Sequence, residues 1–108
     1  MTEKRVSLAR DFSMDPGPRY KRQGPYSGEL FREQIVKWLK AAQHLHIDLD
    51  GTTGIGSSFL DEAFGGLVRD EGMSPDDVRR RITIKSERDE TYLLDIEESL
   101  QQAASQRV

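Results

Sequence analysis

Residues 51–58 read GTTGIGSS and place three glycines and four hydroxyl side chains in one short turn. Their spacing follows the phosphate-loop pattern GxxxxGK[ST], but Ser57 stands where the lysine that contacts the β- and γ-phosphates would be. We therefore reject a nucleoside triphosphatase. Two alternatives stay open: the backbone N–H groups bind an anion at the start of a helix, or Ser57 or Ser58 caps that helix. The turn residues that we expect to contact an anion or a partner are Gly51, Thr52, Thr53, Gly54 and Gly56.

The rest of the chain offers no arrangement typical of catalysis or of metal binding. It has no GxSxG motif, and no histidine stands at a recognisable triad spacing from a serine and an acid. The lack of cysteine excludes disulfides and thiolate metal sites. His44 and His46 would share one face of a strand, so a metal site there would need distant carboxylates as well. We expect no enzymatic activity, no metal and no cofactor.

The charge of the chain argues against a general nucleic-acid binder. It carries 16 Lys+Arg against 19 Asp+Glu, a net charge of -3, whereas such binders show a basic excess. The charge is unevenly spread, with a basic loop at Arg19, Lys21 and Arg22 and mostly acids in residues 61–77, which favours steering toward a partner. No apolar run has the length of a membrane span, and MTEKRVSLAR lacks the apolar core of a signal peptide. We expect a cytoplasmic protein with no membrane or nucleic-acid partner.

Three short segments alternate apolar and polar residues, as strands with one buried face do. Their apolar residues are Val6, Leu8 and Phe12, then Leu45, Ile47 and Leu49, then Ile82 and Ile84. Helical periodicity predicts a helix after each strand. The first is capped by Ser27 and carries an apolar stripe from Leu30 to Ala42, the second covers 58–71 and ends at Gly72, and the third covers 89–104.

This order predicts the fold class, α/β, with a small mainly parallel sheet. Helical crossovers favour parallel neighbours, but the strands alternate instead of being apolar throughout. We therefore expect three helices packed on one face, with the other face polar or covered by a partner. Residues 4–104 would form a single domain, with 1–3 and 105–108 as flexible termini.

Two irregular features complete this picture. The loop of residues 15–29, DPGPRYKRQGPYSGE, is too long for an ordinary connection and would form a hairpin-like excursion or an extra short strand. In the second helix, Gly65 and Gly66 are adjacent, although glycine in a helix costs about 1 kcal/mol relative to alanine. The pair predicts close approach of another backbone, either an internal strand or a partner's surface.

The stretch from Asp48 to Leu67 resembles the STAS domain of sulfate transporters and anti-sigma-factor antagonists. Asp48-Leu49 match the end of a buried strand in that family, and Ser57-Ser58 match its hydroxyl pair. The resemblance implies that Ser58 is phosphorylated by an ATP-binding anti-sigma kinase and that phosphorylation releases the complex. Gly56 stands where the antagonists have an acid, and Phe59 where they have a glycine.

The whole chain is similar to a STAS-like family of bacterial proteins known as a domain of unknown function. The shared features are DFS at 11–13, GPRY at 17–20, GP and SGE at 24–29, FR at 31–32, and SSFLDEAFGGL at 57–67. The resemblance implies a partner, because some members of that family are fused to, or are expected to act with, histidine-kinase-like ATPase domains.

We therefore expect a bacterial regulatory protein-interaction module that resembles an anti-sigma-factor antagonist. Its partner would be a histidine-kinase-like ATP-binding protein, bound through residues 51–67 and released by phosphate on Ser58 or Ser57. Asp61 and Glu62 would lie in that interface, with Arg19 and Tyr20 nearby. One alternative is a nucleotide or anion sensor that uses the glycine-rich turn. Another is a homodimer formed through the polar sheet face.

Overall fold

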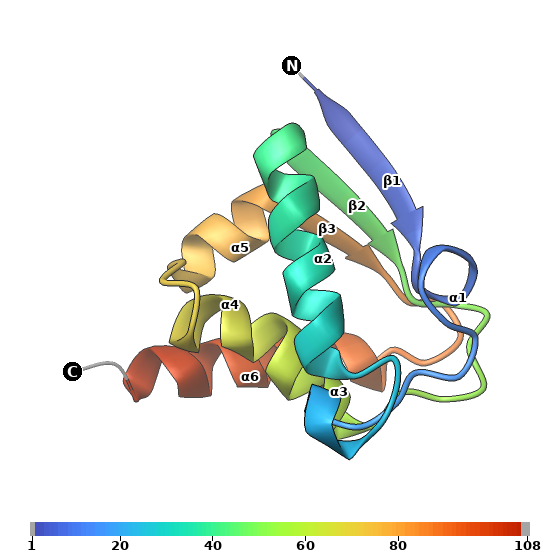
Figure 1. Cartoon of the computed structure of the whole chain (residues 1–108). Helices are drawn as coiled ribbons and strands as arrows, with labels where there is room; N and C mark the ends of the chain where they lie inside the picture. The colour runs from blue at the N-terminus through green and yellow to red at the C-terminus, as the bar shows by residue number, and fades with distance from the viewer. Residues whose placement is uncertain (1, 107–108) are drawn as a thin grey trace.

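Three short parallel strands form the sheet of the computed structural model, which describes residues 2–106. The strands are β1 (Glu3–Ser7), β2 (His44–Asp48) and β3 (Ile82–Lys85), in the order β1-β2-β3. Val6 lies opposite Ile47, and Ile47 lies opposite Ile84. Figure 1 shows β1 at one edge of the sheet and the longer helices together to one side. The predicted α/β fold with a parallel sheet is confirmed.

The three predicted helices are present, and the middle one is not regular. They are α2 (Gly28–Ala41), the continuous helical segment α3 (Ser57–Leu60), η2 (Asp61–Gly65) and α4 (Gly66–Arg69), and finally α6 (Thr91–Ser105). The part labelled η2 is a π-helix. Ser27 caps α2 as expected, because its hydroxyl accepts a hydrogen bond from the Leu30 N–H at 3.1 Å.

Three shorter helical elements were not predicted. The chain also forms α1 (Leu8–Asp11), the 3₁₀ turn η1 (Lys21–Gln23) and α5 (Pro75–Arg81). Leu8 and Phe12 therefore do not belong to the first strand. β1 ends at Ser7, whose side chain caps α1 by accepting from the Arg10 N–H. Leu8 is still buried, but in the first turn of that helix.

The apolar core lies between the sheet and the helices. Leu45 and Ile47 of β2 are buried, whereas His44, His46 and Asp48 on the opposite face are only half-buried. Three phenylalanines join α2 to the helical segment 57–69, with ring centroids 5.9 Å apart for Phe31 and Phe59 and 6.3 Å apart for Phe31 and Phe64. The sheet is thus covered on one face and polar on the other, as the alternating strands predicted.

The long loop is a hairpin-like excursion with no strand in it. Gly17 N–H donates to the Tyr26 carbonyl at 2.8 Å, and Gly28 N–H donates to the Pro18 carbonyl at 2.9 Å, so the two arms of the loop are joined at its base. No helix within residues 2–106 is both long and apolar enough to cross a lipid bilayer.

The expected flexible termini fall partly within regular structure. Residues 1, 107 and 108 lie outside the described residues, whereas Glu3 opens β1 and Ser105 closes α6.

Candidate functional site

The carboxyl ends of all three strands meet at one edge of the sheet, where open α/β sheets bind their ligands. The loops that follow the strands are bound to one another there. The Thr53 hydroxyl lies 2.6 Å from Asp15 Oδ1, and the Thr53 N–H donates to the Met14 carbonyl at 2.9 Å. The Asp50 carboxylate accepts from the backbone N–H groups of Glu87 and Arg88. Segments from three parts of the sequence therefore form one surface.

The glycine-rich turn is shaped by two glycines and held by its own amide groups. Gly51 has φ 97° and Gly54 has φ 151°, conformations that L side chains rarely adopt. Thr52 is half-buried, while Thr53 and Gly54 are exposed. The Thr53 N–H donates to the Met14 carbonyl, and the Ile55 N–H to the Tyr92 hydroxyl at 3.0 Å. These two donors are already used and are not available to an anion.

Neither Ser57 nor Ser58 caps the helix, so that alternative is wrong. Gly56 is the N-cap of α3 and provides no side-chain hydrogen bond, and the two serines form the first two helical positions. Both side chains are exposed. Within residues 2–106, neither hydroxyl takes part in a hydrogen bond. Their side chains therefore have no structural role that a substitution would disturb.

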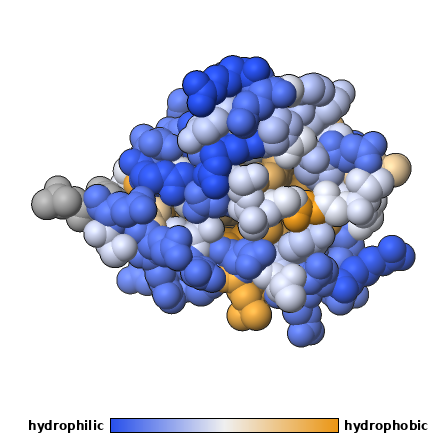
Figure 2. Space-filling model, turned by 90° about the horizontal axis from the view of Figure 1, so that it is seen from below, coloured by the Kyte–Doolittle hydropathy of each residue, from blue (hydrophilic) through white to orange (hydrophobic). Residues whose placement is uncertain are grey.

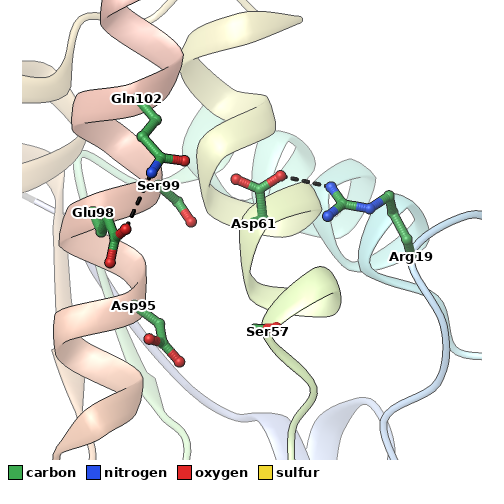
Figure 3. Close-up of a pocket in the computed structure, with 7 residues that line it drawn as sticks. All are labelled: Arg19, Ser57, Asp61, Asp95, Glu98, Ser99 and Gln102. Atoms are coloured by element: carbon green, nitrogen blue, oxygen red, sulfur yellow. Dashed lines mark hydrogen bonds and ion pairs between the residues drawn. The ribbon is translucent and has the colours of Figure 1, made fainter.

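Ser57 lies at a hollow between the helical segment 57–69 and α6. The hollow has a volume of about 390 Å³ and is lined by Arg19, Ser57, Asp61, Asp95, Glu98, Ser99 and Gln102 (Figure 3). Three of these are carboxylates and one is a guanidinium. Arg19 Nη1 is 2.6 Å from Asp61 Oδ2, so the single cation is already paired. Burial alone would raise the pKa of Asp61, but Arg19 and Arg69 outweigh it and hold the pKa below the ordinary 3.8.

Glu62 is not on the surface where it was expected. Only 4% of the residue is exposed, and its carboxylate is paired with Arg32, which is 8% exposed. Arg19 and Arg69 each place a nitrogen 3.5 Å from Glu62 Oε1. The cause is the apolar stripe of residues 59–68, which turns this side of the helix toward α2. Glu62 is therefore an internal ion-pair residue and not a contact for a partner.

The same ion pair explains the adjacent glycines. A Cβ at position 66 would lie 2.6 Å from Arg32 Nη1, and a Cβ at position 65 would lie 3.3 Å from the Ser99 Cβ in α6. The close neighbours are thus a buried arginine side chain and a helix. The internal strand that the sequence suggested does not occupy this place, and both glycines are buried within the chain itself.

The model of the family described as a STAS-like domain of unknown function (DUF4325) matches residues 27–92, more than half of the chain. The chain belongs to this STAS-like family. The matched range includes the cap of α2, the buried Arg32–Glu62 pair and the whole glycine-rich turn. Neither the curated proteins nor the solved structures contain a match.

The remaining predicted residues of this STAS-like domain divide between two places. Arg19, Ser57 and Asp61 come together at the hollow, but Tyr20 does not line it. Tyr20 lies in a separate hollow with Lys21, Arg22 and Glu29, where the Arg22 guanidinium is 5.1 Å from its ring centroid. Within residues 2–106, no group of three or more His, Cys, Asp or Glu side chains could hold a metal ion.

Sequence reasoning missed the α6 wall of the hollow. Its four residues, Asp95, Glu98, Ser99 and Gln102, follow the spacing i, i+3, i+4, i+7 and form a polar stripe beside the apolar one. Two exposed apolar side chains were missed as well: Met14 is 60% exposed and Leu94 is 69% exposed. The face seen from below in Figure 2 is largely hydrophilic, with apolar residues in small separate spots.

Proposed function

We propose that this STAS-like domain is a regulatory protein-interaction module, acting by binding and not by catalysis. Its partner would be a histidine-kinase-like ATP-binding protein of the anti-sigma type, and phosphate on Ser58 would release it. The observation that carries the proposal is the Ser58 hydroxyl. It is exposed at the start of α3, at the carboxyl edge of the sheet, and the fold makes no use of it.

The surroundings of the two serines favour Ser58 over Ser57. A phosphate on Ser57 would add about -1.5 to -2 charges beside Asp61, Asp95 and Glu98 in the hollow. Arg19 offers little compensation, because it is paired with Asp61 already. Ser58 does not line the hollow, so its phosphate would meet the helix N-terminus away from Asp95 and Glu98, with Asp61 one helical turn further along. A helix N-terminus stabilises negative charge, and the folded domain would tolerate the modification.

One apolar side chain beside the turn offers an anchor for the partner. The Met14 carbonyl accepts a hydrogen bond from the Thr53 N–H, which holds this residue next to the turn. Its side chain is 60% exposed. An apolar anchor beside the turn suits a switch, because a new charge on the docking surface must lose water when the partner docks.

The anion-sensor alternative has less support from the contacts at the turn. Arg19, the cation that would complete such a site, is bound to Asp61, and two amides of the turn already have acceptors. We therefore do not place a ligand site at the glycine-rich turn.

Affinity capture from the host lysate tests the switch with three variants and the native domain. We expect the native domain and Ser58→Ala to retain a kinase-like ATP-binding protein, identified by mass spectrometry. Ser58→Asp should retain at least about tenfold less, since like charge at an interface costs several kcal/mol. Ser57→Asp is the matched control, because it adds the same charge one residue away.

The proposal is wrong if Ser58→Asp captures the same proteins in the same amounts as the native domain, or if no ATP-binding protein is captured at all. Equal losses for Ser57→Asp and Ser58→Asp would assign the effect to general charge and would contradict the choice of Ser58. Thermal melting of each variant checks that the fold is intact: Ser58→Ala and Ser58→Asp should melt as the native domain does, and Ser57→Asp slightly lower, because its charge falls beside three carboxylates.

A further inference from the structure

The sheet face opposite the helices carries a hollow of about 440 Å³. Parallel sheets are almost always covered on both faces. A face that the chain leaves open must therefore be polar enough to contact water, or must be covered by a bound molecule. The residues of the hollow come from all three strands and from α1. Those that carry polar groups include Arg5, Arg10, His46, Asp48, Thr83 and Lys85.

The strand register brings these side chains into two rows across the sheet. Arg5, His46 and Thr83 are opposite one another, and so are Ser7, Asp48 and Lys85. Alternate residues of a strand share a face, so both rows point to the open side, away from the buried Val6 and Ile47. Arg10 joins them from α1, the short helix that directly follows β1.

The cations of this hollow are poorly neutralised, in contrast to the arginines of the interior. Arg5 has no ion pair within residues 2–106. The Lys85 Nζ is 3.8 Å from the nearest oxygens of Asp48 and Glu87, and Arg10 reaches Asp11 only at 3.5 Å. By comparison, Arg19 lies 2.6 Å from Asp61. A chain of net charge -3 thus gathers three loosely held cations in the lining of one hollow, against one lining carboxylate, Asp48. Outside the lining, the carboxylates of Glu3, Asp11 and Glu87 contact His46, Arg10 and Lys85, respectively.

We infer that this hollow binds a phosphate-bearing small anion. Guanidinium groups bind phosphate oxygens through two parallel hydrogen bonds, and Arg5 and Arg10 offer two such groups. Lys85 adds a third charge. The Ser7 oxygen accepts from the Arg10 N–H, which leaves its own hydrogen able to donate to a ligand. A volume of about 440 Å³ falls in the range of ordinary small-molecule sites.

A substitution of Asp48 tests the inference, because the direction of the change in anion affinity can be predicted. Its carboxylate lies in the hollow and repels an anion, while its Oδ1 accepts from the Asp50 N–H at 2.9 Å. The amide oxygen of asparagine can accept the same hydrogen bond. Asp48→Asn should therefore keep the local structure and bind the anion more tightly than the native domain does.

The test is an NMR titration of the ¹⁵N-labelled domain with pyrophosphate and, separately, with ADP, at constant ionic strength. We expect saturable shifts at amides of residues 5–10, 46–48 and 83–85. Arg5→Gln should weaken binding about tenfold, the usual size of a lost charged hydrogen bond, and Asp48→Asn should strengthen it. Lys37→Gln, which removes an exposed charge on α2, is the control and should change nothing.

Each other outcome overturns the inference. Shifts confined to residues 51–58 would place the anion at the glycine-rich turn. Shifts that stay linear, or that Arg5→Gln and Lys37→Gln reduce equally, would indicate general charge screening. Saturation by ADP alone would require the base and would contradict a site built for the phosphate. The inference does not depend on the proposed switch, because Ser58 does not line this hollow.

Discussion

Gly66 lies directly beside the buried side chain of Arg32. A Cβ at this position would be 2.6 Å from Arg32 Nη1 and 2.8 Å from its Cδ. The guanidinium cannot simply move aside, because it is paired with Glu62, with Asp70 at 3.3 Å and with Glu71 at 3.1 Å. Breaking one side of a buried ion pair leaves an uncompensated charge. A residue that looks unfavourable in a helix is thus required by a neighbour 34 positions away in the sequence.

Gly66→Ala should lower the free energy of unfolding by about 1–3 kcal/mol, as overpacking does. Helix propensity alone predicts the opposite, a gain of about 1 kcal/mol. Urea unfolding followed by circular dichroism separates the two effects. Lys37→Ala, which introduces the same residue at an exposed position of α2, is the control and should stay within about 0.5 kcal/mol of the native domain. A variant at position 66 that is as stable as the native domain would contradict the steric explanation.

At the scale of elements, the serines at the starts of the helices are of two kinds: some cap the helix through a side-chain hydrogen bond, and others do not. Ser27 is fully buried and its hydroxyl caps α2. Ser74 caps α5 in the same way, by accepting from the Asp77 N–H at 3.0 Å. α3 begins instead after Gly56, and its serines cap nothing. The helix that carries the proposed switch is therefore one whose first turn can be modified without loss of a cap.

Ser27→Ala should destabilise the domain by about 1 kcal/mol, the usual cost of a lost N-cap. Ser58→Ala should leave the stability unchanged, because its hydroxyl has no partner within the described chain. Thermal melts of the two variants, measured under the same conditions, test these two predictions. Equal destabilisation by both would mean that Ser58 does cap α3 and would remove the main reason for choosing it as the switch.

The sequence predicted those elements whose apolar residues recur with a clear period. The three strands and the helices α2, 57–69 and α6 were found in this way. α5 was missed because it has a single buried apolar residue, Val78, although Ser74, Pro75 and two acids form a recognisable helix start. Leu8 was misplaced because its burial fits the alternation of β1, while the cap formed by Ser7 decides its backbone.

The candidate site was less predictable, because its contacts join distant segments. The turn and both serines were identified from their residue types alone. Burial of Glu62 could not be foreseen, since it depends on Arg32 and on the π-helical turns of residues 61–65, which change the residues that share a face. The paired state of Arg19 likewise depends on how the 15–29 loop folds back on the helix.

At the scale of the whole molecule, several carboxylates are stabilised in their charged form by the fold. The pKa of Asp50 is lowered because the N–H groups of Arg88 and Glu87 donate to it, and the pKa of Glu97 is lowered by hydrogen bonding to Arg79. For Asp61, burial opposes the shift, but Arg19 and Arg69 still bring the pKa below its ordinary value. Such groups stabilise the folded state above their unfolded pKa, and this contribution is lost as the pH falls toward the folded pKa.

The urea midpoint should therefore be nearly constant from pH 7 to about 5 and should fall between about pH 5 and 3, where carboxylates protonate. Asp61→Asn should lower the midpoint at pH 7 and flatten the fall, because its charged pairing is gone at every pH. Ser27→Ala is the control and should shift the whole curve without changing its shape. A midpoint that rises on acidification would contradict the direction of all three shifts.

Because the strands are parallel, all their amino ends lie at one end of the sheet and all their carboxyl ends at the other. The chain enters β1 at the amino ends of the strands, and the loop that leads from β2 to α3 starts at their carboxyl ends (Figure 1). A fusion partner or an affinity tag joined before Thr2 would thus be held apart from the proposed docking surface by the length of the sheet. Because all three strands run in the same direction, the sheet itself separates an N-terminal fusion from the protein that binds at the docking surface.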